Sequence, residues 1–265
     1  MATNEDAKTI VNKPERTKLL ELLINSTTLH EPDQLKTLLR SMDNVDVIAK
    51  VFLLEGLPFI FANSPMKYLV FREQVADRFE IGYQDVCIVG SAKLGFSPSS
   101  HKFGRPFSET SDVDVVIISS VLFDRGTHAL LEYINGIGPG LVFGQTESVS
   151  VKAWVWRAHK EAVRNYVYDN FNPGLLPYEH SLRKEVFNNI SSTSALFLAL
   201  QPQVFVSKIR CRVFRNWRAA ESYYANSLRQ VKLSLSGQQE DDAFVEVDDE
   251  EDGAELTEAV SSPNA

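Results

Sequence analysis

The sequence has few cysteines, no long apolar run and no familiar nucleotide-binding loop, and each of these absences excludes a class of protein. Its two cysteines, Cys87 and Cys211, both lie in apolar runs, which excludes a disulfide-stapled miniprotein and favours a reducing compartment. No uncharged apolar run approaches the ~18 residues that span a bilayer, and the first sixteen residues lack the apolar stretch of a signal peptide. We therefore expect a cytoplasmic protein with no membrane partner.

Two common phosphate-binding motifs are also missing. The chain contains no G-x-x-x-x-G-K-[ST] loop, and no G-x-G-x-x-G follows a predicted strand. What remains is ordinary for a folded protein, because 44% of the 265 residues are hydrophobic and 23% are charged. A globular protein is expected, with a phosphate site, if any, of another kind.

The charge is unevenly distributed. The formal net charge is -8, but 11 of the 35 acidic residues fall between Glu240 and Glu258, and no Lys or Arg follows Lys232. Residues 1–238 therefore carry 24 acids against 27 bases, a net charge of +3. A mildly basic body suits an anionic partner such as a nucleotide or nucleic acid, whereas the acidic end is expected to be disordered. The tail either solubilises the protein or folds back over basic residues.

Periodicity divides the chain into four regions: a loose leader over 1–14, a helical region over 15–64, a core over 65–237 and the disordered acidic tail over 238–265. Helical spacing marks 19–24, 32–42 and 45–54 in the second region. Within the core we expect helices over 65–80, 121–134, 148–168, 178–200 and 215–232, and strands over 85–89, 112–119 and 204–214. Ala92 to Ser111, rich in Gly, Pro and Ser, is expected to be a functional loop. The pattern predicts an α+β or α/β fold with a small mixed sheet.

The chemistry is concentrated in two short segments. Asp112 and Asp114 are two residues apart on a predicted strand, so both carboxylates project to the same face and are able to hold divalent cations. Gly90 and Ser91 follow the preceding strand, where a glycine permits close backbone approach and a hydroxyl can donate to phosphate. Lys93 adds a positive charge. Either segment alone is a weak signal, because Asp-x-Asp and Gly-Ser are both common in unrelated proteins.

Together these residues resemble the nucleotidyltransferase superfamily typified by DNA polymerase beta, in which Gly-Ser at a strand end is followed by Asp-x-Asp on the next strand. The matching positions are Gly90, Ser91, Gly95, Ser111, Asp112 and Asp114. The resemblance implies transfer of a nucleoside monophosphate from ATP or another NTP to a hydroxyl, with Asp112 and Asp114 as catalytic ligands of two Mg²⁺ ions or of Mn²⁺. It implies RNA, protein, a small molecule or another nucleotide as acceptor, the last as in bacterial antiviral defence.

The sequence departs from the family in one respect. Family members use a third carboxylate on a later strand, but 204–214 contains no acid and instead offers Lys208, Arg210 and Arg212, which we assign to nucleotide binding. Glu147 and Glu179 are available acids, yet neither lies in a predicted strand. The alternative is a catalytically degenerate member that binds nucleic acid or regulates a protein partner.

Overall fold

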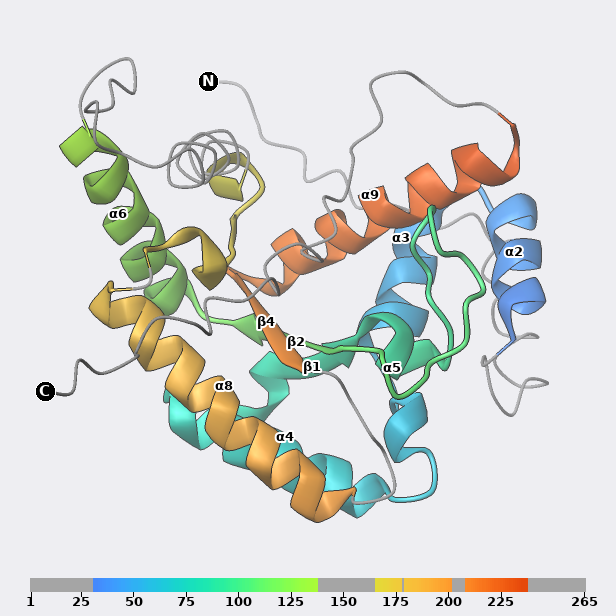
Figure 1. The fold of residues 1–265 in the computed structure, drawn as a ribbon. Helices are drawn as coiled ribbons and strands as arrows, with labels where there is room; N and C mark the ends of the chain where they lie inside the picture. The colour runs from blue at the N-terminus through green and yellow to red at the C-terminus, as the bar shows by residue number, and fades with distance from the viewer. Residues whose placement is uncertain (1–30, 138–164, 178, 202–207, 238–265) are drawn as a thin grey trace, which may run out of the picture.

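A computed structural model describes residues 31–137, 165–177, 179–201 and 208–237, which form an α+β fold around a four-stranded mixed sheet (Figure 1). The strands are β1 (Val86–Val89), β2 (Val113–Ile118), β3 (Asn170–Phe171) and β4 (Ile209–Phe214). Their order is β1-β2-β4-β3. The central strands β2 and β4 are parallel, and each outer strand is antiparallel to its neighbour. The predicted α+β class with a small mixed sheet is confirmed.

Helices account for most of the remaining described residues, and two of them begin at the prolines that the sequence predicts as helix starts. Pro32 and Pro65 occupy first-turn positions, where the missing N–H costs nothing. The helices are α2 (Pro32–Ser41), α3 (Val45–Ile48), the π-helix η1 (Ala49–Leu54), the short 3₁₀ helix η2 (Phe59–Phe61), α4 (Pro65–Phe79), η3 (Tyr83–Asp85), α5 (Gly90–Leu94), α6 (Ser120–Ile137), η4 (Pro173–Leu175), α8 (Ser181–Leu200) and α9 (Trp217–Leu235).

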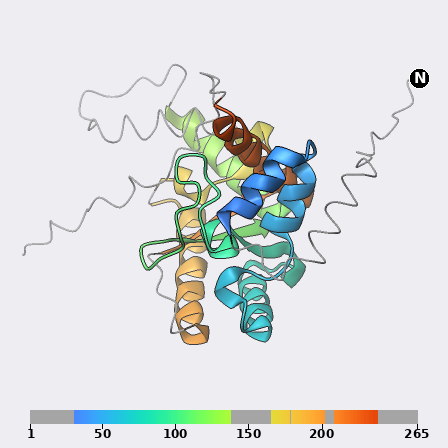
Figure 2. The same cartoon turned by 90° about the vertical axis from the view of Figure 1, so that its right-hand side faces the viewer.

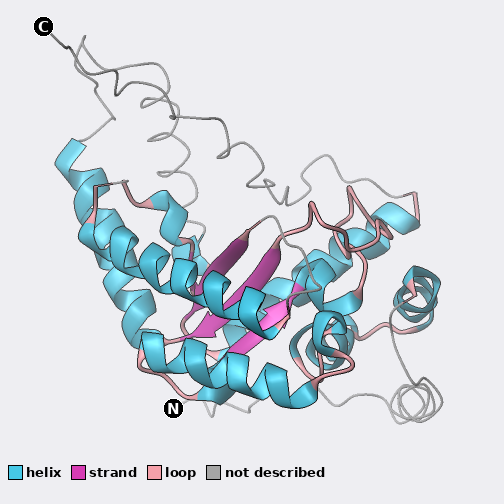
Figure 3. Cartoon of the chain, turned by 60° about the horizontal axis from the view of Figure 1, so that its bottom comes forward, coloured by secondary structure: helices cyan, strands magenta, loops and turns pink. Residues whose placement is uncertain are grey.

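Strand alternation gives the sheet two buried faces, with helices on both sides (Figure 3). Val113, Val115 and Ile117 of β2 belong to a core cluster that includes residues of α4 and α8. Val116 and Ile118 belong to a second cluster with Tyr223 of α9. The even-numbered residues of β2 therefore face α9. Asp114 has this parity, which sets the side of the sheet on which the candidate site lies.

The N-terminal helices pack against the far end of α9, so the two ends of the described chain lie side by side (Figure 2). Apolar residues of α2, α3 and η1 form a third cluster with Leu228 and Val231 of α9. Polar contacts join the same elements: Lys50 pairs with Glu221 at 2.8 Å, and Arg229 pairs with Asp46 at 2.7 Å. This packing fixes α9 above the sheet.

Some predictions lie outside the described residues, namely the leader over 1–14, the helix over 19–24, most of the helix over 148–168 and the acidic tail over 238–265. One boundary is corrected: residues 92–94, expected to begin the long loop, complete helix α5, and the loop begins at Gly95. Among the helices that the structure describes, none combines the length and hydrophobicity needed to cross a bilayer.

Candidate nucleotide-binding cleft

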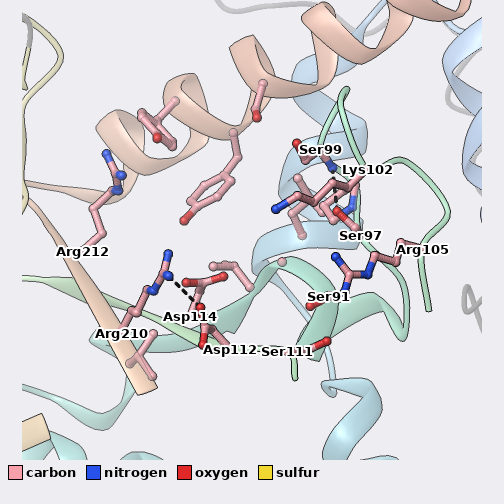
Figure 4. A pocket seen from close by; sticks show the side chains of 18 of the residues that line it. Ser91, Ser97, Ser99, Lys102, Arg105, Ser111, Asp112, Asp114, Arg210 and Arg212 are labelled. Atoms are coloured by element: carbon pink, nitrogen blue, oxygen red, sulfur yellow. Dashed lines mark hydrogen bonds and ion pairs between the residues drawn. The ribbon is translucent and has the colours of Figure 1, made fainter. Parts of the chain in front are cut away.

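A cleft of about 510 Å³ opens between the edge of the sheet, α9 and the loop that follows α5 (Figure 4). Residues from five parts of the chain line it, which brings together most of the residues that the sequence singles out. They are Gly90 and Ser91 from α5; Ser97, Ser99, Lys102, Arg105 and Ser111 from the loop; Asp112 and Asp114; Arg210 and Arg212 from β4; and Tyr223, Tyr224 and Ser227 from α9.

Gly90 and the aspartates meet at the floor of this cleft. Asp114 lies on β2 in register with Val89, which directly precedes Gly90. Gly90 has φ +67°, a conformation that favours glycine, and a Cβ there would lie 2.9 Å from the Asp114 Oδ2 atom. Asp112, one residue before the strand, lines the same cleft. The predicted convergence of the Gly-Ser corner with the aspartate pair is therefore present in the structure.

Two arginines of β4 form the opposite wall. Arg210 lies in register opposite Asp114, and its Nη2 atom lies 2.8 Å from Asp112 Oδ2. The guanidinium of Arg212 stacks 4.8 Å from the ring centroid of Tyr223 on α9. Both side chains reach the cleft because residues 210 and 212 share the sheet face of Asp114. Arg210 and Arg212, which the sequence analysis assigns to nucleotide binding, thus both line the cleft.

Lys93 does not reach the cleft, and its assignment to phosphate binding is corrected. Its side chain is 4% exposed, and Nζ donates to the carbonyl oxygens of Glu55 and of Gly56, the latter at 2.7 Å. Burial lowers the pKa of Lys93 to about 8. Because Gly90-Ser91 opens a helix rather than a simple turn, Lys93 lies about 200° around the axis from Ser91 and points away. It fastens α5 to the end of η1 instead.

Lys208 is the second residue that the structure leaves outside the cleft. It precedes the first residue of β4, its side chain is exposed, and its carbonyl accepts a hydrogen bond from Val113 N at 2.9 Å. Ser111, by contrast, does line the cleft, and its hydroxyl accepts from Ser108 N at 3.0 Å. Lys208 is therefore an edge residue, whereas Ser111 belongs to the floor.

Sequence reasoning missed two cations of this cleft, Lys102 and Arg105. Both come from the loop after α5 and extend toward the cleft from the side opposite β4 (Figure 4). The signal was available, because these are the only Lys or Arg residues between Lys93 and Ser111 in a stretch rich in Gly, Pro and Ser. With Arg210 and Arg212 they make four cationic side chains against two carboxylates among the described residues that line the cleft, a formal excess of two positive charges.

The donor set fits a divalent cation only in part. Two carboxylates, completed by water and phosphate oxygens, are ligands that Mg²⁺ accepts. Within the described parts of the chain, however, no group of three or more His, Cys, Asp or Glu residues comes together. Glu179 is exposed and pairs with Lys184, while Glu147 lies outside the described residues. Arg210 stands opposite Asp114, on the strand where the family resemblance implies a third acid.

Comparison of the chain with protein-family models, with curated proteins and with solved structures finds no match. The resemblance to the polymerase beta-like nucleotidyltransferases therefore depends on the Gly-Ser and Asp-x-Asp residues and on the cleft that they share.

Proposed function

We propose that the protein is a metal-dependent nucleotidyltransferase that moves a nucleoside monophosphate from a nucleoside triphosphate to a hydroxyl acceptor. The observation that carries this proposal is the meeting of Gly90, Asp112 and Asp114 at the floor of one cationic cleft. Phosphoryl transfer needs a place for a divalent cation beside a place for a polyanion. A wholly cationic groove would supply only the place for the polyanion, and an apolar pocket would supply neither.

Each group has a distinct role in this mechanism. Asp112 and Asp114 would hold the cation, Gly90 keeps the backbone clear of Asp114, and the Ser91 hydroxyl would donate to a phosphate oxygen. The acceptor hydroxyl gives up its proton to solvent water and its oxygen bonds to the α-phosphorus, while the bond from that phosphorus to the pyrophosphate oxygen breaks and pyrophosphate leaves. When bound, Mg²⁺ or Mn²⁺ neutralises charge on the phosphate oxygens and activates the phosphorus. Arg210 and Arg212 offset the negative charge that collects on the transferring group.

A second candidate function, binding without catalysis, is favoured by one specific observation. Arg210 lies opposite Asp114 and pairs with Asp112, so a cation of the protein itself occupies the side of the aspartates where a second metal ion would need a ligand. In that case the cleft binds a nucleotide or the phosphates of a nucleic acid and transfers nothing. Both candidates bind a nucleotide, but only the transferase forms a transfer product.

An assay with labelled nucleotides distinguishes the transferase from the binding protein. The protein is incubated with each α-³²P-labelled NTP and with Mg²⁺ or Mn²⁺, alone and with total RNA, and products are resolved on denaturing gels. The transferase proposal predicts a labelled RNA, protein or oligonucleotide that Asp112→Asn and Asp114→Asn each reduce at least ~100-fold, because each removes a metal ligand. Asp77→Asn, a matched change on the exposed face of α4, leaves product formation unchanged.

Two results would overturn the transferase proposal. The first is product formation that survives both substitutions. The second is the absence of any product from wild-type protein that nevertheless binds nucleotide in a manner requiring Arg210, which would establish the binding function instead.

A further inference from the structure

The loop after α5 contains a structured segment, Gly95–Phe107, which we call the arm. Its two sides pair through the bridge between Phe96 and Pro106 and through three backbone hydrogen bonds of 2.8–3.0 Å. These run from Ser97 N to Arg105 O, from Phe107 N to Gly95 O and from Gly104 N to Ser97 O. The arm is therefore a small hairpin-like element rather than an irregular connection.

Apolar contacts fix the base of the arm to the body of the protein. Phe96 is 2% exposed and packs, together with half-buried Phe103, into the cluster formed by α2, α3 and α9. The two rings meet edge to face with centroids 6.1 Å apart. Gly104, at φ +82°, allows the arm to pass close to Pro32, whose Cβ would lie 3.4 Å from an added Cβ. A segment held in this way presents its polar side chains in a preset orientation.

Those polar side chains have the composition of a phosphate site. Lys102, Arg105, Ser97 and Ser99 all line the cleft, and the arm contains no Asp or Glu. In the close view, Arg105 lies beside Ser91, and Lys102 lies beyond it near Ser97 and Ser99 (Figure 4). Asp112 and Asp114 lie between these groups and the arginines of β4. Proceeding from the aspartates, a chain of phosphates would thus meet Ser91, then Arg105, then Lys102.

We infer that the arm is the binding site for the β- and γ-phosphates of the nucleoside triphosphate, and that it makes the cleft selective for triphosphates over monophosphates. This inference rests on the proposed function, since it takes the α-phosphate to lie at the aspartates. Guanidinium and ammonium groups form charge-assisted hydrogen bonds with phosphate oxygens. The serine hydroxyls add neutral donors. A monophosphate does not extend to the arm and gains none of these contacts.

The test is a binding measurement that does not depend on transfer. Isothermal titration with Mg²⁺ compares the α,β-methylene triphosphate analogues of adenosine, cytidine, guanosine and uridine with the corresponding monophosphates. For the nucleoside that binds tightest, wild-type protein is expected to prefer the triphosphate by at least ~100-fold, on the order of ten-fold for each arm cation. Lys102→Gln/Arg105→Gln is expected to reduce that preference to within several-fold and to leave monophosphate affinity unchanged.

The matched control is Lys36→Gln/Arg40→Gln, which removes one Lys and one Arg charge from α2. This control should keep the full preference for the triphosphate over the monophosphate. Thermal unfolding of the arm variant checks that it remains folded, and Lys102→Arg, which keeps the charge, should retain most of the preference. The inference is overturned if the arm variant keeps the wild-type preference, or if it loses triphosphate and monophosphate affinity equally. In those cases the transferase proposal stands, whereas wild-type protein that binds no nucleotide removes both.

Discussion

The guanidinium of Arg210 lies 2.8 Å from a carboxylate oxygen of Asp112, while the Arg210 backbone stands in register opposite Asp114 on the neighbouring parallel strand. The cation that pairs with Asp112 therefore belongs to the residue opposite Asp114, on the sheet face from which both carboxylates project. The Arg210 side chain is 24% exposed and the Asp112 side chain 20% exposed, so solvent screens their interaction less than it would on an open surface.

This relationship makes a prediction about metal binding. Replacing Arg210 with Met should destabilise the protein by roughly 1–3 kcal/mol, because the part-buried Asp112 carboxylate then lacks its cationic partner. Mg²⁺ should recover most of this loss by taking the place of the guanidinium. Thermal unfolding with 0 and ~10 mM Mg²⁺, well above an ordinary dissociation constant, measures the effect. Arg125→Met, which breaks the exposed pair with Glu185, is the control and should show no Mg²⁺ response. A variant of Arg210 that Mg²⁺ does not stabilise would argue against a metal at the aspartates.

Gly90 provides a second prediction. Gly90→Ala places a methyl group 2.9 Å from Asp114 Oδ2 and also strains the backbone at φ +67°. We expect a stability loss of about 1–2 kcal/mol from the backbone and, in addition, at least ~10-fold weaker binding of Mg²⁺ and triphosphate, because Asp114 must move. Gly237→Ala has a similar φ of +73° with no atom within 4 Å of the added Cβ. It should show the stability loss alone. Equal binding by the two variants would contradict the close approach of Gly90 to Asp114.

Lys93 should make the stability of the protein depend on pH, and a comparison with a Lys93 variant isolates its contribution. Its folded-state pKa of about 8 lies below the ordinary 10.5, so above pH 8 the folded protein releases this proton before the unfolded chain does. The unfolded chain then holds more protons, and the free energy of unfolding rises with pH over this window. Relative to Lys93→Met, wild-type protein should gain up to about 3 kcal/mol between pH 8 and pH 10.5.

Urea unfolding of both proteins at several pH values measures this difference, and other titrating groups cancel because both proteins contain them. The gain should be absent below pH 7, where Lys93 is protonated in both the folded and the unfolded state. Parallel pH profiles for wild type and variant would show that Lys93 is more solvated than its 4% exposure indicates.

The rigidity of the arm is tested through Phe96. Phe96→Ala removes a ring that is 2% exposed and should cost about 3 kcal/mol or more. Hydrogen exchange at the amides of Ser97, Gly104 and Phe107, the donors of the hairpin-like pairing, should accelerate more than exchange at amides of β2, since the pairing loses its anchor. Phe187→Ala, at a 45% exposed position on α8, should change neither set. If arm and β2 amides accelerate equally, Phe96 supports the fold as a whole and not the arm in particular.

The sequence predicts the scaffold of the site well because the relevant signals are local. The apolar runs ending at Val89 and Ile118 mark β1 and β2, and the two-residue spacing of Asp112 and Asp114 sets their common face. The alternation of Arg210 and Arg212 with apolar residues places both arginines on one face of their own strand. None of these predictions requires knowledge of distant contacts.

The sequence misassigns or misses residues whose positions depend on contacts between distant parts of the chain. The position of Lys93 shortly after Gly-Ser predicts phosphate binding, but the carbonyl oxygens of Glu55 and Gly56, just after η1, hold it on the other side of α5. Lys102 and Arg105 gave no periodic signal, since the arm is shaped by the packing of Phe96 against helices some 50 residues earlier and over 120 residues later in the chain. Pairing of Arg210 with Asp112 depends on the parallel register of β2 and β4, which local sequence does not specify.

The central claim is that Asp112 and Asp114 form, with the Gly90-Ser91 corner, a single site for a divalent cation and a triphosphate. Its most direct test is an anomalous difference map from crystals grown with Mn²⁺ and the tightest-binding α,β-methylene triphosphate. We predict a manganese peak between the carboxylates of Asp112 and Asp114, with the phosphates passing Ser91 toward Arg105. Manganese bound elsewhere, or a nucleotide lying outside the cleft, would contradict the claim.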